Sequence, residues 1–466
     1  MLAIFGLVLP GFSFGQAPAS DPAKAAAQPP PVAAPAPAKG ADDENDAPKE
    51  ERFIDPNAKK TLAIFKPLTY VGPPIRIAGA PNDLTRVQNM AARVQNFEPD
   101  FVKRYVEYFA VELSKRDNIN ALINAPPGMA PARARGLEVA VDALTRPLID
   151  GKANTNPTFL TDYNKILFES SLPKLLDNNF LSRIDAMIVL GMAGGTTKEA
   201  LDLYAAQLKI PDQIIWVKMW AARGFTNAAQ SGKANIDAYR AITGADALVT
   251  FLNSDPKLPY FAQFRAFEAL GSIRVATAKR PDLTLDAASV AAGFLGDPKA
   301  RLETRAYAAW ALGMMRVAPQ IVPYNFRLAG SEIGELATTL GTKIVAEYDE
   351  HPDTFDRDSD QARNLAALLM FQVVPSLSGE ENPNDSGLLR STHPSAAEAK
   401  PFLTKLEEKV KAVSREAYEL LRAGGVAQKV RRNDLAAKVA DLKTFLDQDQ
   451  NKPKSRQLVP NGPVLP

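Results

Sequence analysis

The sequence predicts an all-α fold: an α-solenoid-like stack of helical hairpins that ends in an antiparallel helical hairpin. From about Asp83 onward, apolar residues recur at three- and four-residue steps, which is the spacing of one helix face. Glycine or proline marks nearly every junction between these windows, and strand-type alternation is almost absent after residue 85. The 466 residues, 46% of them hydrophobic, are enough for two or three compact domains or one elongated array.

The first residues have the features of an export signal. Met1 to Leu9 form an uncharged apolar run, and Ser13 and Gly15 are small residues at the positions that a signal peptidase reads. We therefore expect residues 1–15 to be a signal peptide, although the usual basic residue near the start is missing. A buried or disordered N-terminus is the alternative. The run is too short to span a bilayer, which takes about 20 apolar residues.

Residues 16–58 are predicted to be a disordered spacer. Residues 17–40 are nearly all alanine and proline, a composition that cannot form a packed core and favours extended polyproline II segments. An acidic stretch at 41–51 follows it. Residues 59–82 are predicted to be an extended lead-in, because prolines interrupt their strand-like apolar residues.

Residues 83–375 are predicted to form the helical-repeat domain. Its best evidence is a pair of similar units, each with an Asp-Pro dipeptide followed by Ala-Leu-Gly. Asp255-Pro256 precedes Gly271, and Asp297-Pro298 precedes Gly313, with the same separation of 15 residues from proline to glycine and 42 residues between the units. We expect the proline to open the second helix of each unit, and the glycine to end that helix in a left-handed cap.

This pattern resembles the HEAT/armadillo-type helical repeats, with the Asp-Pro, an arginine in the second helix (Arg265 and Arg305) and the Ala-Leu-Gly end as the matching residues. The resemblance is clear over 240–316 and loose over 130–375. A gap of 33 residues between Gly191 and Gly224 departs from the family spacing. The resemblance implies paired helices stacked into an extended surface that binds partners.

The C-terminal part is predicted to be a linker, a hairpin and a tail. Residues 376–397 are loop-like. Residues 398–446 have two apolar seams at coiled-coil spacing, separated by Ala423-Gly424-Gly425, so that the second helix can turn back on the first. We expect the hairpin to lean on the helix near 359–374. Residues 447–466 are predicted to be a disordered tail.

No pattern in the sequence defines a catalytic, cofactor or metal site, and we expect none. The chain has no cysteine, and its two histidines, His351 and His393, both precede proline, which favours loops. The acidic run at 349–360, with Asp356, Asp358 and Asp360, has alternating carboxylates that can bind calcium. It lacks the glycine and glutamate of an EF-hand, so a solvated loop that caps the next helix is the simpler interpretation.

Two further patterns have a structural and a functional interpretation. The segment from Gly191 to Lys198 is similar to a phosphate-binding loop, but its lysine follows the threonines, so we expect a helix end, a glycine turn and a threonine cap. Trp216 and Trp220 lie four residues apart and Trp310 lies in the best repeat unit. They are predicted to be core residues; exposed, they would be able to stack on sugar rings.

These observations predict an exported, non-enzymatic binding or scaffold protein of the cell envelope, in the periplasm, at the cell surface or outside the cell. We expect a protein partner. The near-neutral net charge of +2 argues against nucleic acid, and no segment is apolar enough for a transmembrane span. The alternatives are an α/α-toroid enzyme that degrades polysaccharides and a structural spacer between envelope layers.

Overall fold

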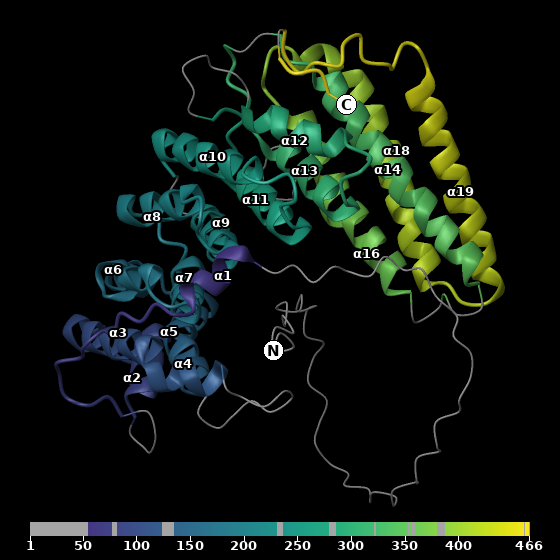
Figure 1. Ribbon diagram of the computed structural model, residues 1–466. Coiled ribbons are helices and arrows are strands. Elements are labelled where there is room, and N and C mark those ends of the chain that lie inside the picture. Colours follow the sequence, from purple (N-terminus) through teal and green to yellow (C-terminus); the bar gives the residue numbers. More distant parts are fainter. Residues whose placement is uncertain are drawn as a thin grey trace, which may run out of the picture.

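The protein is all-α in a computed structural model that describes residues 55–76, 82–123, 135–230, 236–278, 286–320, 323–352, 355, 359–379, 387–460 and 462–465. Within these ranges it has helices and no strand, apart from two isolated bridges. Figure 1 shows the helices following an arc, with three long helices at its C-terminal end. The predicted signal peptide lies outside the described residues, as does the spacer up to residue 54.

The chain enters the described structure through a short helix instead of a disordered spacer. This helix, α1 (Pro56–Thr61), begins behind Asp55, whose side chain accepts a hydrogen bond from the Asn57 backbone. A non-helical stretch from residue 62 to 76 then crosses the body. Side chains of residues distant in the sequence hydrogen-bond to its backbone. The Asn178 amide, for example, accepts from the Lys66 N–H and donates to the Lys66 carbonyl. The predicted disordered spacer at 16–58 is therefore wrong at its C-terminal end, because residues 55–58 pack on the folded body and begin a helix.

Most of the helices form two rows, with consecutive helices alternating between them. The N-terminal end of the stack contains α2 (Asp83–Ala91), α3 (Pro99–Ser114), α4 (Arg116–Ile123) and the 3-10 helix η1 (Leu172–Asp177). The inner row is α5 (Arg135–Ala153), α7 (Phe180–Ala193), α9 (Ile215–Gln230), α11 (Tyr260–Ile273) and α13 (Leu302–Met314). The outer row is α6 (Pro157–Glu169), α8 (Lys198–Lys209), α10 (Ala238–Leu252) and α12 (Asp286–Gly296). Figure 1 shows α8 and α10 outside α9 and α11.

The two Asp-Pro units adopt the same turn, but not the predicted one. In each unit the aspartate side chain accepts a hydrogen bond from a backbone two residues on, at 2.8 Å from Lys257 to Asp255 and 2.9 Å from Lys299 to Asp297. The prolines lie in this turn, several residues before α11 and α13 begin. The aspartate thus closes an Asx turn between the helices, and the proline does not open the second helix.

The glycines of the two Ala-Leu-Gly ends serve close packing, which corrects the predicted left-handed caps. Gly271 and Gly313 are helical, and a Cβ atom on Gly271 would overlap the ring of Trp310 in α13. A Cβ atom on Gly313 would overlap the backbone of Ser376. Each glycine therefore lets the next element approach its helix closely. The arginines differ as well, since Arg305 donates to the carbonyl of Leu295 at 2.9 Å whereas Arg265 pairs with a glutamate.

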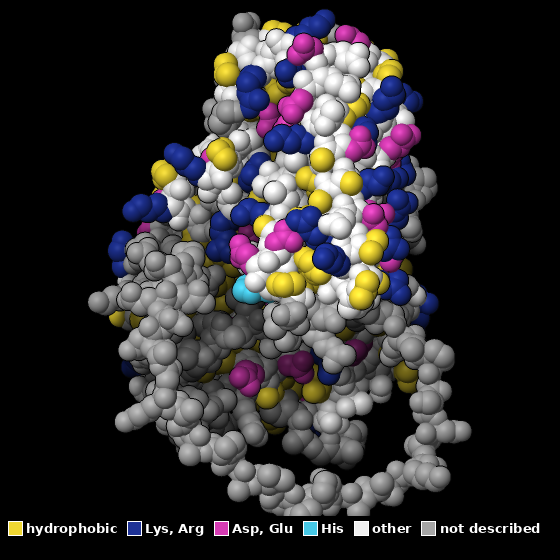
Figure 2. Space-filling view, turned by 90° about the vertical axis from the view of Figure 1, so that its right-hand side faces the viewer, with side chains coloured by type: hydrophobic (Ala, Val, Ile, Leu, Met, Phe, Trp, Pro, Cys, Tyr) yellow, Lys and Arg dark blue, Asp and Glu magenta, His cyan; other side chains and the backbone are white. Residues whose placement is uncertain are grey.

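Three long helices close the C-terminal end of the stack: α14 (Phe326–Glu350), α18 (Ala396–Arg422) and α19 (Val426–Asp447). Both predicted seams of α18 and α19 are buried, and Gly425 adopts a positive φ of 57° in the turn between them. Their main support is α14, and α18 also contacts the helical segment at 359–374, as expected. Figure 2 views this side of the molecule, on which basic and acidic side chains are interspersed.

The segment between α14 and α18 is more structured than a linker. It contains α16 (Asp360–Leu368), the π-helix η2 (Leu369–Val373), α17 (Val374–Ser378) and the 3-10 helix η3 (Leu388–Arg390). Helices η2 and α17 pack on α13 and so extend the inner row. The predicted linker at 376–397 is thus wrong at both ends, because α17 and α18 reach into it.

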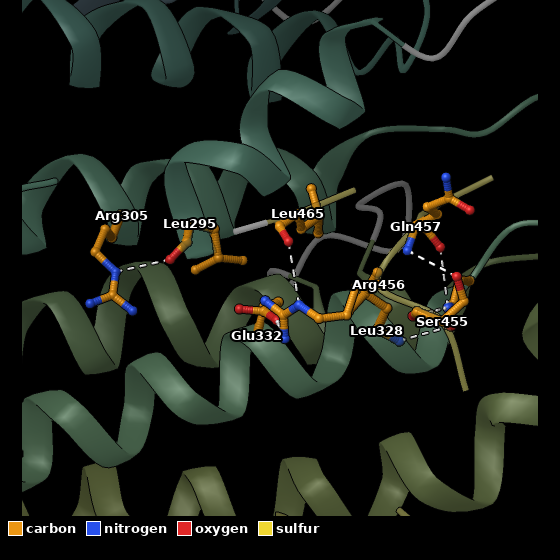
Figure 3. A network of polar contacts seen from close by, with 9 residues as sticks. Leu295, Arg305, Leu328, Glu332, Ser455, Arg456, Gln457 and Leu465 are labelled. Carbon is orange, nitrogen blue, oxygen red and sulfur yellow. Dashed lines mark hydrogen bonds and ion pairs between the residues drawn. The ribbon is translucent and has the colours of Figure 1, made fainter. Parts of the chain in front are cut away.

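The predicted disordered tail folds back onto α14 (Figure 3). Asn325 at the start of α14 donates its backbone N–H to Leu458, and Arg456 pairs with Glu332 at 3.1 Å. Leu458 and Leu465 are buried at 2% and 4% exposure. The tail is ordered because it buries these two leucines and caps the first turn of a long helix.

Candidate functional site

The inner row presents one stripe of side chains on the side turned away from the outer row. On α9 the half-buried residues recur at 216, 220, 223 and 227, and on α11 they include 260, 261, 264, 265, 268 and 272. These steps of three and four place them on one face of each helix. Gly224, on another face of α9, lies against Tyr204 of the outer helix α8. The stripe is therefore the surface that the inner row leaves accessible.

Five aromatic rings form a continuous chain across this stripe, from α9 over α11 to α13. Trp216 stacks on Phe261 at 5.0 Å between ring centroids and 7° between planes. Phe261 contacts Tyr260 at 5.9 Å, Tyr260 contacts Phe264 at 6.4 Å, and Phe264 contacts Tyr307 at 5.1 Å. All five side chains are half-buried. We call them the aromatic ladder.

Arginines flank the ladder. The Arg301 guanidinium lies 3.9 Å above the Tyr260 ring, and that of Arg265 lies 5.1 Å from the Phe264 ring. Glu268 accepts from Arg223 and from Arg265, both at 2.7 Å. Cation–π contacts and ion pairs of this kind hold the arginine forks in place, so that less side-chain entropy is lost when a ligand binds them.

The ladder side of the inner row also contains a carboxyl group with an unusual pKa. Asp185 on α7 is half-buried, and burial, with a smaller contribution from the negative charge of Glu138 on α5, raises its pKa to about 7. Toward the C-terminal end of the same helices, Lys152 donates to the carbonyl of Met192 at 3.0 Å. Burial, and then the charge of Arg223, lower the pKa of this lysine.

The N-terminal segment is anchored beside the ladder. The side chain of Asp55 accepts a hydrogen bond of 2.5 Å from the backbone of Ile215, the first residue of α9. The next residue along α9 is Trp216, the first ring of the ladder. Buried Lys218 adds a positive charge near Asp55. The chain therefore leaves the described structure, toward its N-terminus, next to the ladder.

Of the weighed site residues, Gly191 lies against Trp220 within the stack, whereas the two histidines lie at opposite ends of α14. His351 is exposed at the end of α14. His393 is buried at 4% exposure and accepts from the Ser395 backbone at 3.1 Å, on the wall of a cavity of about 230 Å³ between η3 and α18. It is thus part of the packing and not a solvated loop residue.

The acidic run at 349–360 is only partly described, since Asp356 and Asp358 lie outside the described residues. Asp349 pairs with Arg432 of α19, with 2.8 Å from Nε to Oδ1, and Asp360 pairs with Arg363. Ser359 caps α16. Among the described residues, no group of three or more acidic residues or histidines is arranged to hold a metal ion.

The segment at 191–198 has the predicted helix end and threonine cap. Gly194 ends α7 with a φ of 60°, and Thr197 accepts a hydrogen bond from the backbone of Ala200 in α8. The tryptophans are only partly the predicted core residues. Trp310 is 9% exposed, whereas Trp216 and Trp220 are half-buried on the ladder side.

Tyr260, Phe261, Phe264 and Tyr307 were not predicted as site residues. On their own helices they have the spacing of ordinary packing residues, and only the register of the stack brings their rings into one chain. A ladder of this kind can stack on planar or ring-shaped groups and on proline, and its arginines can pair with carboxylates.

No protein family model matches this chain, and neither a curated protein nor a solved structure is detectably similar to it. The HEAT/armadillo resemblance therefore stays a prediction based on residues 240–316. None of the helices in the described residues is long and apolar enough to cross a membrane.

Proposed function

We propose that this chain is an exported, non-enzymatic binding or scaffold protein of the cell envelope, and that it binds a protein partner through the aromatic ladder. The observation that carries the proposal is the chain of five half-buried rings with Arg265 and Arg301 against it. Aromatic residues and arginine are the residue types that contribute most to protein interfaces. The export part rests on residues 1–15 of the sequence.

The contacts within the ladder favour binding over a purely structural role. A ring that serves packing alone is most stable when it is fully buried, yet all five rings keep an exposed edge or face. Because ring-to-ring and guanidinium contacts fix them, the rings lose little conformational freedom when a partner binds. An extended row of such groups suits an elongated partner segment.

The test is photo-crosslinking in the producing cell. A photoreactive phenylalanine analogue replaces Tyr260 in the ladder and, as a matched control, Tyr239, which is 62% exposed on the outer helix α10. We expect the same protein to be crosslinked repeatedly from position 260 and not from position 239. Equal yields from the two positions, or no protein crosslink at 260, would contradict the proposal. Crosslinks to glycan at 260 would favour the enzyme.

One observation favours the polysaccharide-degrading enzyme as a second candidate. A carboxyl group with a pKa of about 7, such as that of Asp185, can hold a proton at neutral pH and donate it as a general acid. Glu138 is the second carboxylate beside it. If the protein cleaves polysaccharides, Asp185→Asn should abolish the activity while the chain stays folded. Unchanged hydrolysis in that variant would remove this candidate.

A further inference from the structure

The aromatic ladder is a surface on which proline rings can stack, and the sequence before Asp55 is rich in proline. Residues 29–37 read Pro-Pro-Pro-Val-Ala-Ala-Pro-Ala-Pro. Proline-rich segments favour the polyproline II conformation, which lies well in grooves lined with aromatic side chains because proline rings stack on them. Such a segment also loses little conformational entropy on binding.

Asp55 tethers this proline-rich segment close to the ladder. The Asp55 side chain is bonded to the first residue of α9, and Trp216 follows immediately. Residues 38–54 connect Pro37 to Asp55, and an extended chain of that length reaches up to roughly 55–60 Å. The ladder crosses two helix-to-helix spacings, about 20 Å. Nine residues of polyproline II span about 28 Å, which is enough to cover it.

The charges on the two sides are complementary. The connecting residues are rich in carboxylates at positions 42, 43, 44, 46, 50 and 51. Along the ladder, Arg223 and Arg265 share the single carboxylate of Glu268, and Arg301 pairs with Glu303 at 3.4 Å. The three guanidinium groups therefore exceed the two carboxylates by one positive charge, and the Arg301 side chain is 49% exposed. Carboxylates that follow the proline segment would therefore lie near guanidinium groups, which pair with them well.

We propose that residues 29–37 of this chain bind its own aromatic ladder, with the acidic residues at 42–51 beside the arginines. The segment then occupies the surface to which the partner binds. A partner that binds the ladder must therefore displace residues 29–37, for example with a proline-rich and acidic segment that binds the ladder more tightly. This inference rests on the proposed binding function of the ladder, but its test does not need the partner.

The test measures a distance between spin labels in the full chain. The chain contains no cysteine, so Ala33→Cys and Lys299→Cys can both be labelled without background. Lys299 is exposed, two residues before Arg301, and does not belong to the ladder. We expect a narrow distribution at about 20 Å, the length of the ladder. Replacing Pro29, Pro30, Pro31, Pro35 and Pro37 by serine should broaden it.

A second variant checks the ladder side. Tyr260→Ala together with Arg301→Ala should broaden the distribution as much as the serine variant does. Ala33→Cys paired with Thr444→Cys, on the exposed side of α19, gives a second, independent distance to the same segment. Its distribution should also become broader in the serine variant. A broad 33–299 distribution that is the same in all three proteins would overturn the proposal.

The distance measurement distinguishes binding within one chain from binding between two copies, and it tests this inference separately from the proposed function. If the short distance disappears when labelled protein is diluted with unlabelled chain, the ligand comes from a second copy, and binding within one chain is wrong. If the distance is broad but position 260 still crosslinks a partner, this inference fails and the proposed function stands. If the distance is short and no partner is crosslinked, the proposed function fails and this inference stands.

Discussion

Two stacked aromatic pairs in this molecule have nearly the same geometry and different surroundings. In the C-terminal bundle, Phe402 of α18 and Phe445 of α19 stack at 5.6 Å and 11°, and both are buried, at 4% and 6% exposure. In the inner row, Trp216 and Phe261 stack at 5.0 Å and 7°, but both stay half-buried. Cations lie against rings in both places. The first pair serves stability, whereas the second leaves its surface accessible to a ligand.

The neighbouring helices explain this difference. In the bundle, α14 carries Gly330, Gly334 and Gly341, which lie against leucines and valines of α18 and α19, so that three helices enclose their shared face. In the stack, each inner helix contacts the helices before and after it and the outer row. On α9 and α11 the residues of the remaining face stay half-buried. A two-row stack therefore generates a surface that a three-helix bundle does not.

The largest expected contrast is in unfolding free energy between the two pairs. Phe445→Ala should destabilise the protein by about 3–5 kcal/mol, because it leaves a cavity in a closed bundle. Phe261→Ala should cost only about 1–2 kcal/mol, because the ring is half-buried and the site can relax. Chemical denaturation of both variants measures the difference. Equal losses would show that the ladder is an ordinary part of the core.

The glycines allow a second comparison inside the stack. Gly313→Ala should destabilise by about 1–3 kcal/mol, because its Cβ atom would overlap the Ser376 backbone, which cannot move aside easily. Gly293→Ala in α12 is the matched control, since no heavy atom lies within 4 Å of its Cβ position. It should stabilise by about 0.5–1 kcal/mol through helix propensity. Thermal unfolding that shifts both variants in the same direction would contradict this packing.

A pH series tests the ladder side of α7. The folded state raises the pKa of Asp185 from 3.8 to about 7, so it binds this proton more tightly than the unfolded chain does. Stability should therefore fall as the pH rises from about 4 to about 7. The full shift would correspond to about 4 kcal/mol, and we expect about 1–2 kcal/mol because the group is half-buried and partly screened.

Asp185→Asn removes this titration without changing the side-chain shape. The variant should be more stable than wild type at pH 8 and nearly equal to it at pH 4, by thermal unfolding in matched buffers. If the difference between the two proteins is the same at both pH values, Asp185 does not titrate in this range.

Local patterns predicted the parts of the fold that local interactions determine. The seams of α18 and α19, from Leu403 to Leu446, are read from spacing alone, and both are buried. The sequence also predicts that the two Asp-Pro turns are equivalent, and in both turns the aspartate accepts a hydrogen bond from the backbone two residues on. The role assigned to the glycines was wrong, since a helix end and a close helix contact both favour glycine after Ala-Leu.

The candidate site and the tail depend on contacts between distant residues. Trp216 and Phe261 are 45 positions apart, and their stacking follows from how α9 and α11 pack, which no local pattern specifies. Leu458 and Leu465 each lie beside a valine in a tail rich in proline and polar residues, and no helical or strand-like spacing predicts their burial. The two leucines are buried because the tail packs on α14, where Arg456 pairs with Glu332.

The most direct test of the central claim is the affinity of a partner identified by crosslinking at position 260. It is measured for wild type, for Tyr260→Ala with Arg301→Ala, and for the control Tyr239→Ala. We expect binding to weaken at least about tenfold, or roughly 1.4 kcal/mol, in the double variant alone, while that variant stays folded. If the double variant is folded and binds the partner as tightly as wild type does, the aromatic ladder is not the binding surface.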